Sequence, residues 1–69
     1  MIRIDARGMR CPWPAIRAAR GLRENPGVAI EILADDPAAE RELGALAERC
    51  GGFLTVFDED GIQVLRISP

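Results

Sequence analysis

The stretch Val28-Ala29-Ile30-Glu31-Ile32-Leu33-Ala34 decides the fold class, together with the Asp35-Asp36-Pro37 that follows it. The first seven residues are almost continuously apolar, which is typical of an interior strand in a parallel sheet. Pro37 suits the first position of a helix and Asp36 suits its N-cap. A buried strand that leads at once into a helix predicts an α/β fold.

A strand and a helix are also expected on the N-terminal side of this stretch. Residues 1–5 alternate in polarity and place Ile2 and Ile4 on one face. A helix is expected from about Pro12 to Glu24, because Asn25-Pro26-Gly27 is a strong breaker. The inward face of this helix is mostly alanine, so the helix could approach a sheet closely.

A second helix, from about Pro37 to Cys50, is expected on the C-terminal side. Its apolar stripe consists of Ala39, Leu43, Leu46 and Cys50. We therefore expect Cys50 in the core, since free cysteine is among the most buried residue types. The charged residues of this helix, Glu42 among them, should face solvent. Gly51-Gly52 should end it.

The remaining residues predict a hairpin and complete the fold. Strands are expected at residues 53–57 and 62–67, with a turn at 58–61 signalled by Asp-Gly. The order is βαβαββ, and short strand–helix–strand connections build parallel pairs with right-handed crossovers. We predict one α/β domain over residues 1–69, a two-layer sandwich with two helices on one face of a four-stranded mixed sheet. The other face has no helix to cover it, which leaves the oligomeric state open.

The segment Arg10-Cys11-Pro12-Trp13-Pro14 holds the candidate reactive residue. Prolines are tolerated in the first turn of a helix, so Pro12 and Pro14 should occupy the first and third helical positions. Cys11 would then lie at the N-cap, where unpaired N–H groups and the helix dipole favour a thiolate. Arg10 and Arg7 add positive charge. We expect a reactive thiol of lowered pKa; the alternative is a small buried cysteine that precedes a helix.

The two acidic residues after the second strand should share an edge with Cys11, because the carboxyl ends of parallel strands meet there. We expect Asp36 to cap the second helix. Asp35 is less constrained, and because a carboxylate close to Cys11 would oppose thiolate formation, it should point away or pair with Arg7 or Arg10.

Trp13 falls on the outward side of the first helix and has two interpretations. It either folds back over the first turn and plugs the edge of the core, or it stays partly exposed as an anchor for a partner.

Composition excludes several kinds of chemistry. The chain has 69 residues, a net charge of −2 and no histidine, so a Cys-His dyad, a Ser-His-Asp triad and a His-ligated zinc site are impossible within it. Cys11 and Cys50 should lie about 20 Å apart, too far for a disulfide. No cofactor and no metal are expected. The absence of a membrane-length apolar run or signal-peptide pattern predicts a cytoplasmic protein.

The chain resembles the TusA family, also called SirA-like, of small sulfur-carrier proteins. The resemblance rests on the Cys-Pro-x-Pro motif at Cys11–Pro14 after Asp5-Ala6-Arg7-Gly8, on Ala34-Asp35-Asp36-Pro37, and on length and element order. It differs where many members carry Gly-His after the second helix, since this chain has Gly51-Gly52-Phe53. The resemblance implies that Cys11 accepts sulfur as a persulfide from a cysteine desulfurase or rhodanese-type donor and passes it to an acceptor protein.

Family members serve tRNA thiolation, molybdenum-cofactor synthesis, sulfur oxidation, selenium metabolism or, with a membrane protein, thiosulfate uptake. The residues expected to support Cys11 or contact a partner are Arg7, Arg10, Pro12, Trp13, Pro14, Asp35 and Asp36. Two other functions stay open from the residues alone. One is a non-catalytic adaptor that binds a partner through Trp13 and the arginine face. The other is RNA binding by the basic first helix, which the negative net charge and scarce aromatic residues disfavour.

Overall fold

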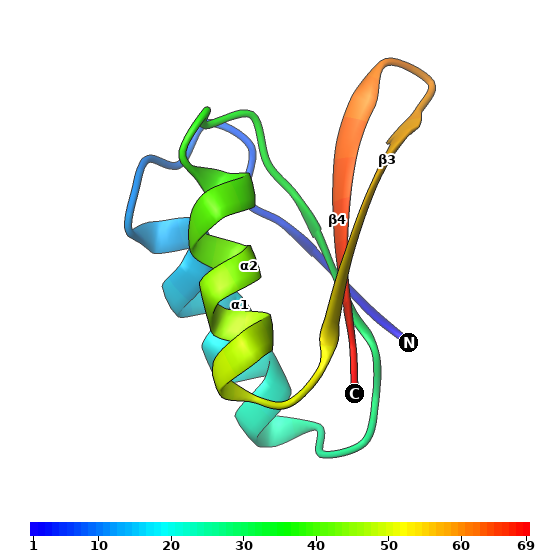
Figure 1. Cartoon of the computed structure of the whole chain (residues 1–69). Coiled ribbons are helices and arrows are strands. Elements are labelled where there is room, and N and C mark those ends of the chain that lie inside the picture. The colour runs from blue at the N-terminus through cyan, green and yellow to red at the C-terminus, as the bar shows by residue number, and fades with distance from the viewer.

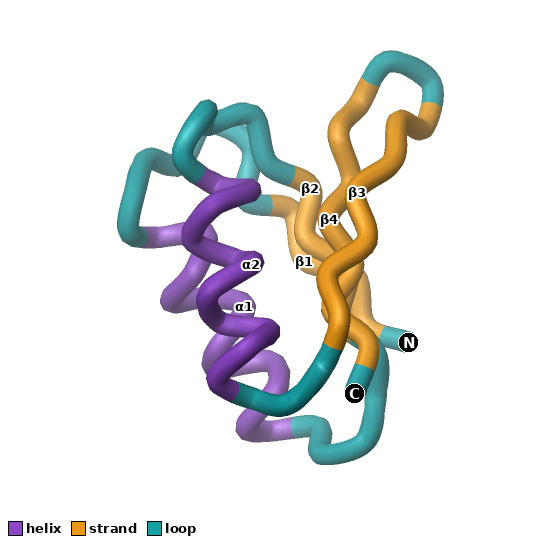
Figure 2. Tube along the Cα trace, viewed as in Figure 1, coloured by secondary structure: helices purple, strands orange, loops and turns teal.

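The structure is a computed structural model that describes residues 1–69. Its elements are β1 (Ile2–Asp5), α1 (Trp13–Glu24), β2 (Ile30–Leu33), α2 (Ala39–Arg49), β3 (Phe53–Glu59) and β4 (Ile62–Ser68). The strands form one sheet in the order β1-β2-β4-β3, and both helices lie on the same side of it (Figures 1 and 2). The predicted two-layer α/β sandwich is confirmed.

The sheet is mixed, as the connections require. β1 pairs with β2 in parallel, because α1 carries the chain back along the sheet between them. β4 is antiparallel to both of its neighbours, β2 and β3. The β3–β4 hairpin is longer than predicted and turns at Asp60-Gly61, where both residues have positive φ (54° and 82°). Asp-Gly is a sequence that tolerates this geometry in a two-residue hairpin loop.

The core lies between the helices and one face of the sheet. Ile30 and Ile32 of β2 are completely buried, and they pack in one cluster with residues of β4 and α2. α1 approaches the sheet closely where its backbone has no side chain: a Cβ on Gly21 would come within 3.1 Å of Ile4 Cδ1 and 3.5 Å of Ile30 Cδ1. The small inward face of α1 therefore sets the distance between the layers.

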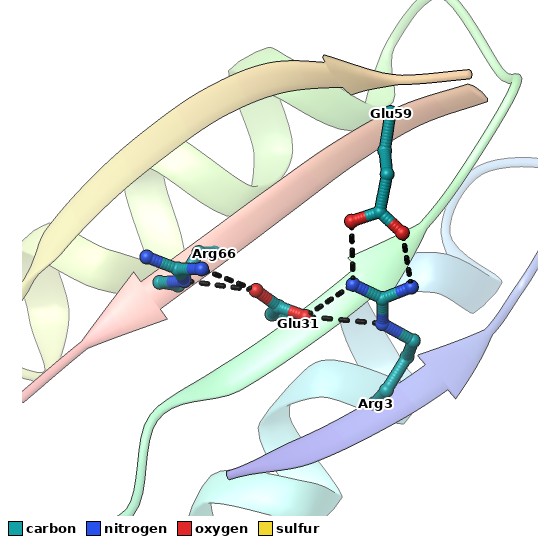
Figure 3. A network of polar contacts seen from close by, with 4 residues as sticks. All are labelled: Arg3, Glu31, Glu59 and Arg66. Carbon is teal, nitrogen blue, oxygen red and sulfur yellow. Dashed lines mark hydrogen bonds and ion pairs between the residues drawn. The ribbon is translucent and has the colours of Figure 1, made fainter. Parts of the chain in front are cut away.

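The other face of the sheet carries a network of ion pairs where a third layer would otherwise lie (Figure 3). Glu31, only 3% exposed, accepts two hydrogen bonds from Arg3 on one carboxylate oxygen and two from Arg66 on the other. Arg3 also pairs with Glu59 at 2.8 Å, and Arg66 lies over the Phe57 ring at 5.1 Å. These four side chains, with Phe57, cover part of the helix-free face with paired charges.

Candidate functional site

Cys11 lies in the loop between β1 and α1 and is exposed to solvent. This loop and the loop between β2 and α2 meet at one edge of the sandwich, at the end where both helices begin (Figure 1). The two loops are joined by hydrogen bonds. The Cys11 N–H donates to Asp36 Oδ2 at 2.9 Å, and the Gly8 N–H donates to Asp35 Oδ1 at 3.0 Å. The predicted grouping of Cys11 with both aspartates is thus present in the structure.

Asp36 has a different role from the predicted N-cap. α2 begins at Ala39 after a turn, with Ala38 in the N-cap position, and no side chain caps it. Asp36 holds that turn instead, because its Oδ1 accepts from the Ala38 N–H at 2.8 Å while its Oδ2 accepts from Cys11. The bonds from Ala38 and Cys11 lower the pKa of Asp36. Its charge is therefore used to fix the backbone that carries the thiol.

The expected cradle of amide hydrogens around the thiol is absent. α1 begins at Trp13, so Pro12 occupies the N-cap and Pro14 the second helical position, one residue later than predicted. Neither proline has an N–H, and the Trp13 N–H donates to the Arg10 carbonyl oxygen at 2.8 Å. No backbone N–H donates to the Cys11 sulfur. The two prolines thus remove the donors that an activating helix start would offer.

The Cys11 thiol contacts a carboxylate that sequence analysis placed in solvent. Its Sγ donates a hydrogen bond to Glu42 Oε2 at 2.6 Å, and Glu42 lies in the first turn of α2. This hydrogen bond, together with partial desolvation and the negative charge of Glu42, raises the pKa of Cys11, and Asp36 acts in the same direction. Arg41 opposes the shift without reversing it. The predicted lowering of the Cys11 pKa is therefore wrong for the isolated protein.

Of the two arginines expected to activate Cys11, Arg7 forms an ion pair and Arg10 does not. Arg7 pairs with Asp5 of β1 at 2.7 Å, so its charge is used within its own loop. Arg10 is exposed, makes no ion pair in the structure, and contributes to the lowered pKa of Asp36. Arg10 and Arg41, which is also exposed and forms no ion pair, are thus the cationic groups near Cys11 that remain available to an incoming molecule.

Trp13 is exposed and does not plug the core. It has 57% of its surface in solvent, and Ile16, three residues later on the same face of α1, has 47%. Pro14 is buried instead, and anchors the start of α1. Of the two interpretations of Trp13, the structure supports the exposed one, a large apolar side chain two residues from the thiol.

Cys50 is exposed at the C-terminal end of α2, and its predicted place in the core is wrong. The buried stripe of α2 ends with Leu46 and Ala47, and Cys50 follows the last helical residue. Both cysteines are free, as predicted. Eight residues of helix, about 12 Å, separate Cys50 from the Glu42 that touches Cys11.

The structure contains no group of three or more histidine, cysteine or acidic side chains placed to hold a metal ion. Neither helix combines the length and the apolar content needed to cross a membrane.

Comparison with known proteins places the chain in a family. The model of the family described as "Sulfurtransferase TusA" matches residues 2–68. The chain belongs to the TusA family. A solved TusA-family relative, the SirA-like protein from Desulfitobacterium hafniense, has the same fold with a TM-score of 0.89 and 34% identity, over 99% of this chain and 96% of that one.

Two curated relatives in the TusA family are named as carriers. The "Putative sulfur carrier protein" of Archaeoglobus fulgidus is 43% identical over 65 residues, which cover 90% of this chain and 84% of the relative. The "Sulfur carrier protein TusA" of Allochromatium vinosum is 32% identical over 59 residues, which cover 84% and 78%. The resemblance noted from the sequence is confirmed at the level of the family.

Proposed function

We propose that residues 1–69 form a single TusA/SirA-like sulfur-carrier domain that holds a persulfide on Cys11. A donor protein of the cysteine desulfurase or rhodanese type would load the thiol, and an acceptor protein would remove the outer sulfur. The observation that supports this most strongly is the position of Cys11, an exposed cysteine whose backbone N–H is held by Asp36 at the open edge of a TusA-family fold. Its relatives named as sulfur carriers support the same function.

The transfer needs no group beyond the two cysteines that exchange sulfur. The Cys11 thiolate attacks the outer sulfur of the donor persulfide, a new S–S bond forms on Cys11, and the donor S–S bond breaks. The donor cysteine leaves as a thiolate and takes up the proton that Cys11 lost. Nothing is oxidised or reduced overall, so neither a metal nor a redox cofactor enters the step.

Activation of the thiol is expected in the complex rather than in the free carrier. In the isolated protein the Glu42 carboxylate raises the Cys11 pKa, and no cationic side chain pairs with either group. A donor that brings a positive charge to this edge would offset Glu42 and Asp36 and release the thiolate. Arg10 and the exposed Trp13 are the side chains next to the thiol that such a partner would contact.

The proposal is tested by loading the protein with a cysteine desulfurase and cysteine, followed by mass spectrometry of the intact chain. We expect a gain of one sulfur atom, removed by a reductant and absent from the Cys11→Ser variant. Cys50→Ser is the matched control, because Cys50 is the other exposed thiol and should load no sulfur. A gain that persists in Cys11→Ser and disappears in Cys50→Ser would contradict the assignment.

The exposure of Trp13 supports a second candidate, a non-catalytic adaptor of the same fold. An adaptor would bind its partner through Trp13 and the arginines of α1, with Cys11 incidental. The two functions differ in their response to substitution. Partner function that survives Cys11→Ala but not Trp13→Ala would favour the adaptor, whereas loss in both variants favours the carrier.

A further inference from the structure

The contact between Cys11 and Glu42 joins the reacting sulfur to a carboxylate that has no other partner. Glu42 Oε2 accepts from the thiol at 2.6 Å, and Glu42 makes no ion pair. Its second oxygen, Oε1, is buried and accepts no hydrogen bond at all. A carboxylate usually satisfies such an oxygen, because a buried unpaired acceptor is costly. The thiol hydrogen is therefore the single hydrogen-bond donor that the protein offers to this group.

We propose that Glu42 biases Cys11 toward its sulfur-free state and thereby promotes release of sulfur to the acceptor. The inference rests on the proposed carrier function and assigns to one residue of α2 the balance between the loaded and empty forms. Glu42 contacts the Cys11 sulfur, but it neither forms nor breaks a bond in the transfer. Its effect is on the equilibrium between loaded and empty Cys11.

The empty state is stabilised by the hydrogen bond itself. A neutral thiol has one hydrogen, and in the structure that hydrogen points to a charged acceptor, which makes the bond stronger than a neutral one. When sulfur is added, the inner sulfur atom is bonded to carbon and sulfur and has no hydrogen left to donate. Loading therefore removes the one donor that Glu42 has.

The loaded state is also opposed by charge. A persulfide is more acidic than a thiol, so its outer sulfur carries negative charge near neutral pH. In the empty protein the inner sulfur lies 2.6 Å from Oε2, and an S–S bond adds only about 2.05 Å, so the outer sulfur of the loaded form stays close to the carboxylate. Two like charges at this separation repel each other, and Asp36 on the adjoining loop adds to the repulsion. Arg41 is the opposing charge.

The balance can be measured as an exchange equilibrium with a small-molecule donor. Cys11 thiol and glutathione persulfide react to give Cys11 persulfide and glutathione, with one S–S bond formed and one broken. At a fixed ratio of glutathione persulfide to glutathione, mass spectrometry gives the ratio of loaded to empty carrier. All variants carry Cys50→Ser, so that Cys11 is the sole thiol.

We expect the loaded-to-empty ratio to rise about tenfold in Glu42→Gln, since one neighbouring charge shifts a titration by about one unit. Glu42→Ala should shift it in the same direction, and it removes the charge without adding an amide donor. Glu48→Gln is the matched control, an exposed carboxylate of α2 that does not contact Cys11 and should leave the ratio unchanged.

The outcomes separate the inference from the proposed function. If no variant, including the parent with Glu42, takes up sulfur, the carrier function itself is overturned, and the inference with it. If the parent loads on Cys11 but the ratio is the same or lower in both Glu42 variants, the carrier function stands and the inference is overturned. A similar rise in Glu48→Gln would also overturn it, because net charge alone would then explain the effect.

Discussion

At the scale of single residues, the contact between Cys11 and Glu42 restrains the thiol in the isolated protein. Oxidation and alkylation both proceed through the thiolate, so a raised pKa makes the exposed sulfur slow to react with small molecules. An exposed cysteine with a lowered pKa would be largely a thiolate at neutral pH and would react readily with oxidants. Under the proposed function, binding of a partner relieves this restraint.

The restraint predicts a specific pH dependence for alkylation of Cys11. Because Glu42 and Asp36 raise the pKa of Cys11 and Arg41 opposes them, the iodoacetamide rate should rise only above the ordinary range of a free thiol. Glu42→Gln should move the midpoint of that rise to lower pH, because it removes the charged acceptor that raises the Cys11 pKa. The experiment follows the rate from pH 6 to 11, about the range in which free thiols titrate, in protein lacking Cys50. An unchanged midpoint would show that the hydrogen bond has no effect in solution.

Sequence analysis singled out Cys11 but not the carboxylate that contacts it. Cys11, Trp13 and the aspartates could be found because a motif and the ends of two strands mark them. Glu42 could not, since it lies outside the apolar stripe of α2, where charged residues normally face solvent. The signal that could have revealed Glu42 is the topology of the fold. Both helices start at the same edge, so the first turn of α2 lies beside the loop that leads into α1. The predicted direction of the Cys11 pKa shift was wrong because the hydrogen bond to Glu42 raises that pKa, while Pro12 and Pro14 lack the N–H groups that would stabilise a thiolate.

At the scale of elements, the junction of α2 and β3 depends on a glycine. Gly52 lies between the end of α2 and the start of β3, and its N–H donates to the Ala47 carbonyl oxygen at 2.8 Å. A Cβ at this position would meet the backbone carbonyl oxygen of Ser68 in β4. Backbone atoms in a sheet cannot move aside as a flexible side chain can, so this site requires glycine.

Two glycine substitutions should therefore have opposite effects on stability. Gly52→Ala should destabilise the protein by about 1–3 kcal/mol, because the added methyl group displaces the end of β4. Gly44→Ala should stabilise it by about 1 kcal/mol, because Gly44 is inside α2 and its Cβ would lie at an ordinary 3.6 Å from Leu54. Urea unfolding of both variants measures the difference. If the two variants changed the free energy of unfolding equally, the close contact of the new Cβ with Ser68 would not destabilise the protein.

The order of the elements could be predicted from the sequence, whereas several of their ends could not. α2 was expected from Pro37 to Cys50 and spans Ala39–Arg49, because Asp36 uses its carboxylate to hold a turn before the helix. At the other end, α2 stops at Arg49, and Cys50 follows it as an exposed residue. The hairpin strands are longer than expected because pairing with β4 extends regular structure to Glu59. Helix and strand ends are decided by such tertiary hydrogen bonds.

At the scale of the whole molecule, the helix-free face of the sheet depends on one buried carboxylate. Glu31 on the interior strand β2 is bracketed by Arg3 on β1 and Arg66 on β4, and Arg3 also pairs with Glu59 on β3, so the network links all four strands. The hydrogen bonds from Arg66 and Arg3 lower the pKa of Glu31. Sequence analysis predicted a bare face but not this network, since the pairing register that aligns the three residues is not visible in a single chain.

Removal of the Glu31 charge should destabilise the fold in a pH-dependent manner. Glu31→Gln should cost about 1–3 kcal/mol near pH 7, because four charge-assisted hydrogen bonds lose their acceptor charge. The pKa of Glu31 is lower in the folded protein than in the unfolded chain, where it is about 4.3, so its charge stabilises the fold at pH values above 4.3. This contribution to stability is lost as the pH falls through the pKa of the folded state. The gap between the variant and the parent should therefore narrow toward pH 2–3.

Urea titrations at pH 7 and in acid measure that gap. Glu24→Gln is the matched control, because Glu24 forms an exposed pair with Arg20 on α1 and should change stability little. A gap for Glu31→Gln that is constant across the pH range would contradict the proposed role of the charge.

The position of Cys50 has a practical consequence for anyone who handles the protein. Two free thiols at opposite ends of the molecule cannot form an intramolecular disulfide. Air oxidation would therefore link separate molecules into disulfide-bonded dimers and longer oligomers. Replacement of Cys50 prevents this cross-linking and leaves the edge that carries Cys11 unchanged. Conversely, a dye attached to Cys50 would lie far from Cys11, where it could report the binding of another protein at the Cys11 edge without obstructing it.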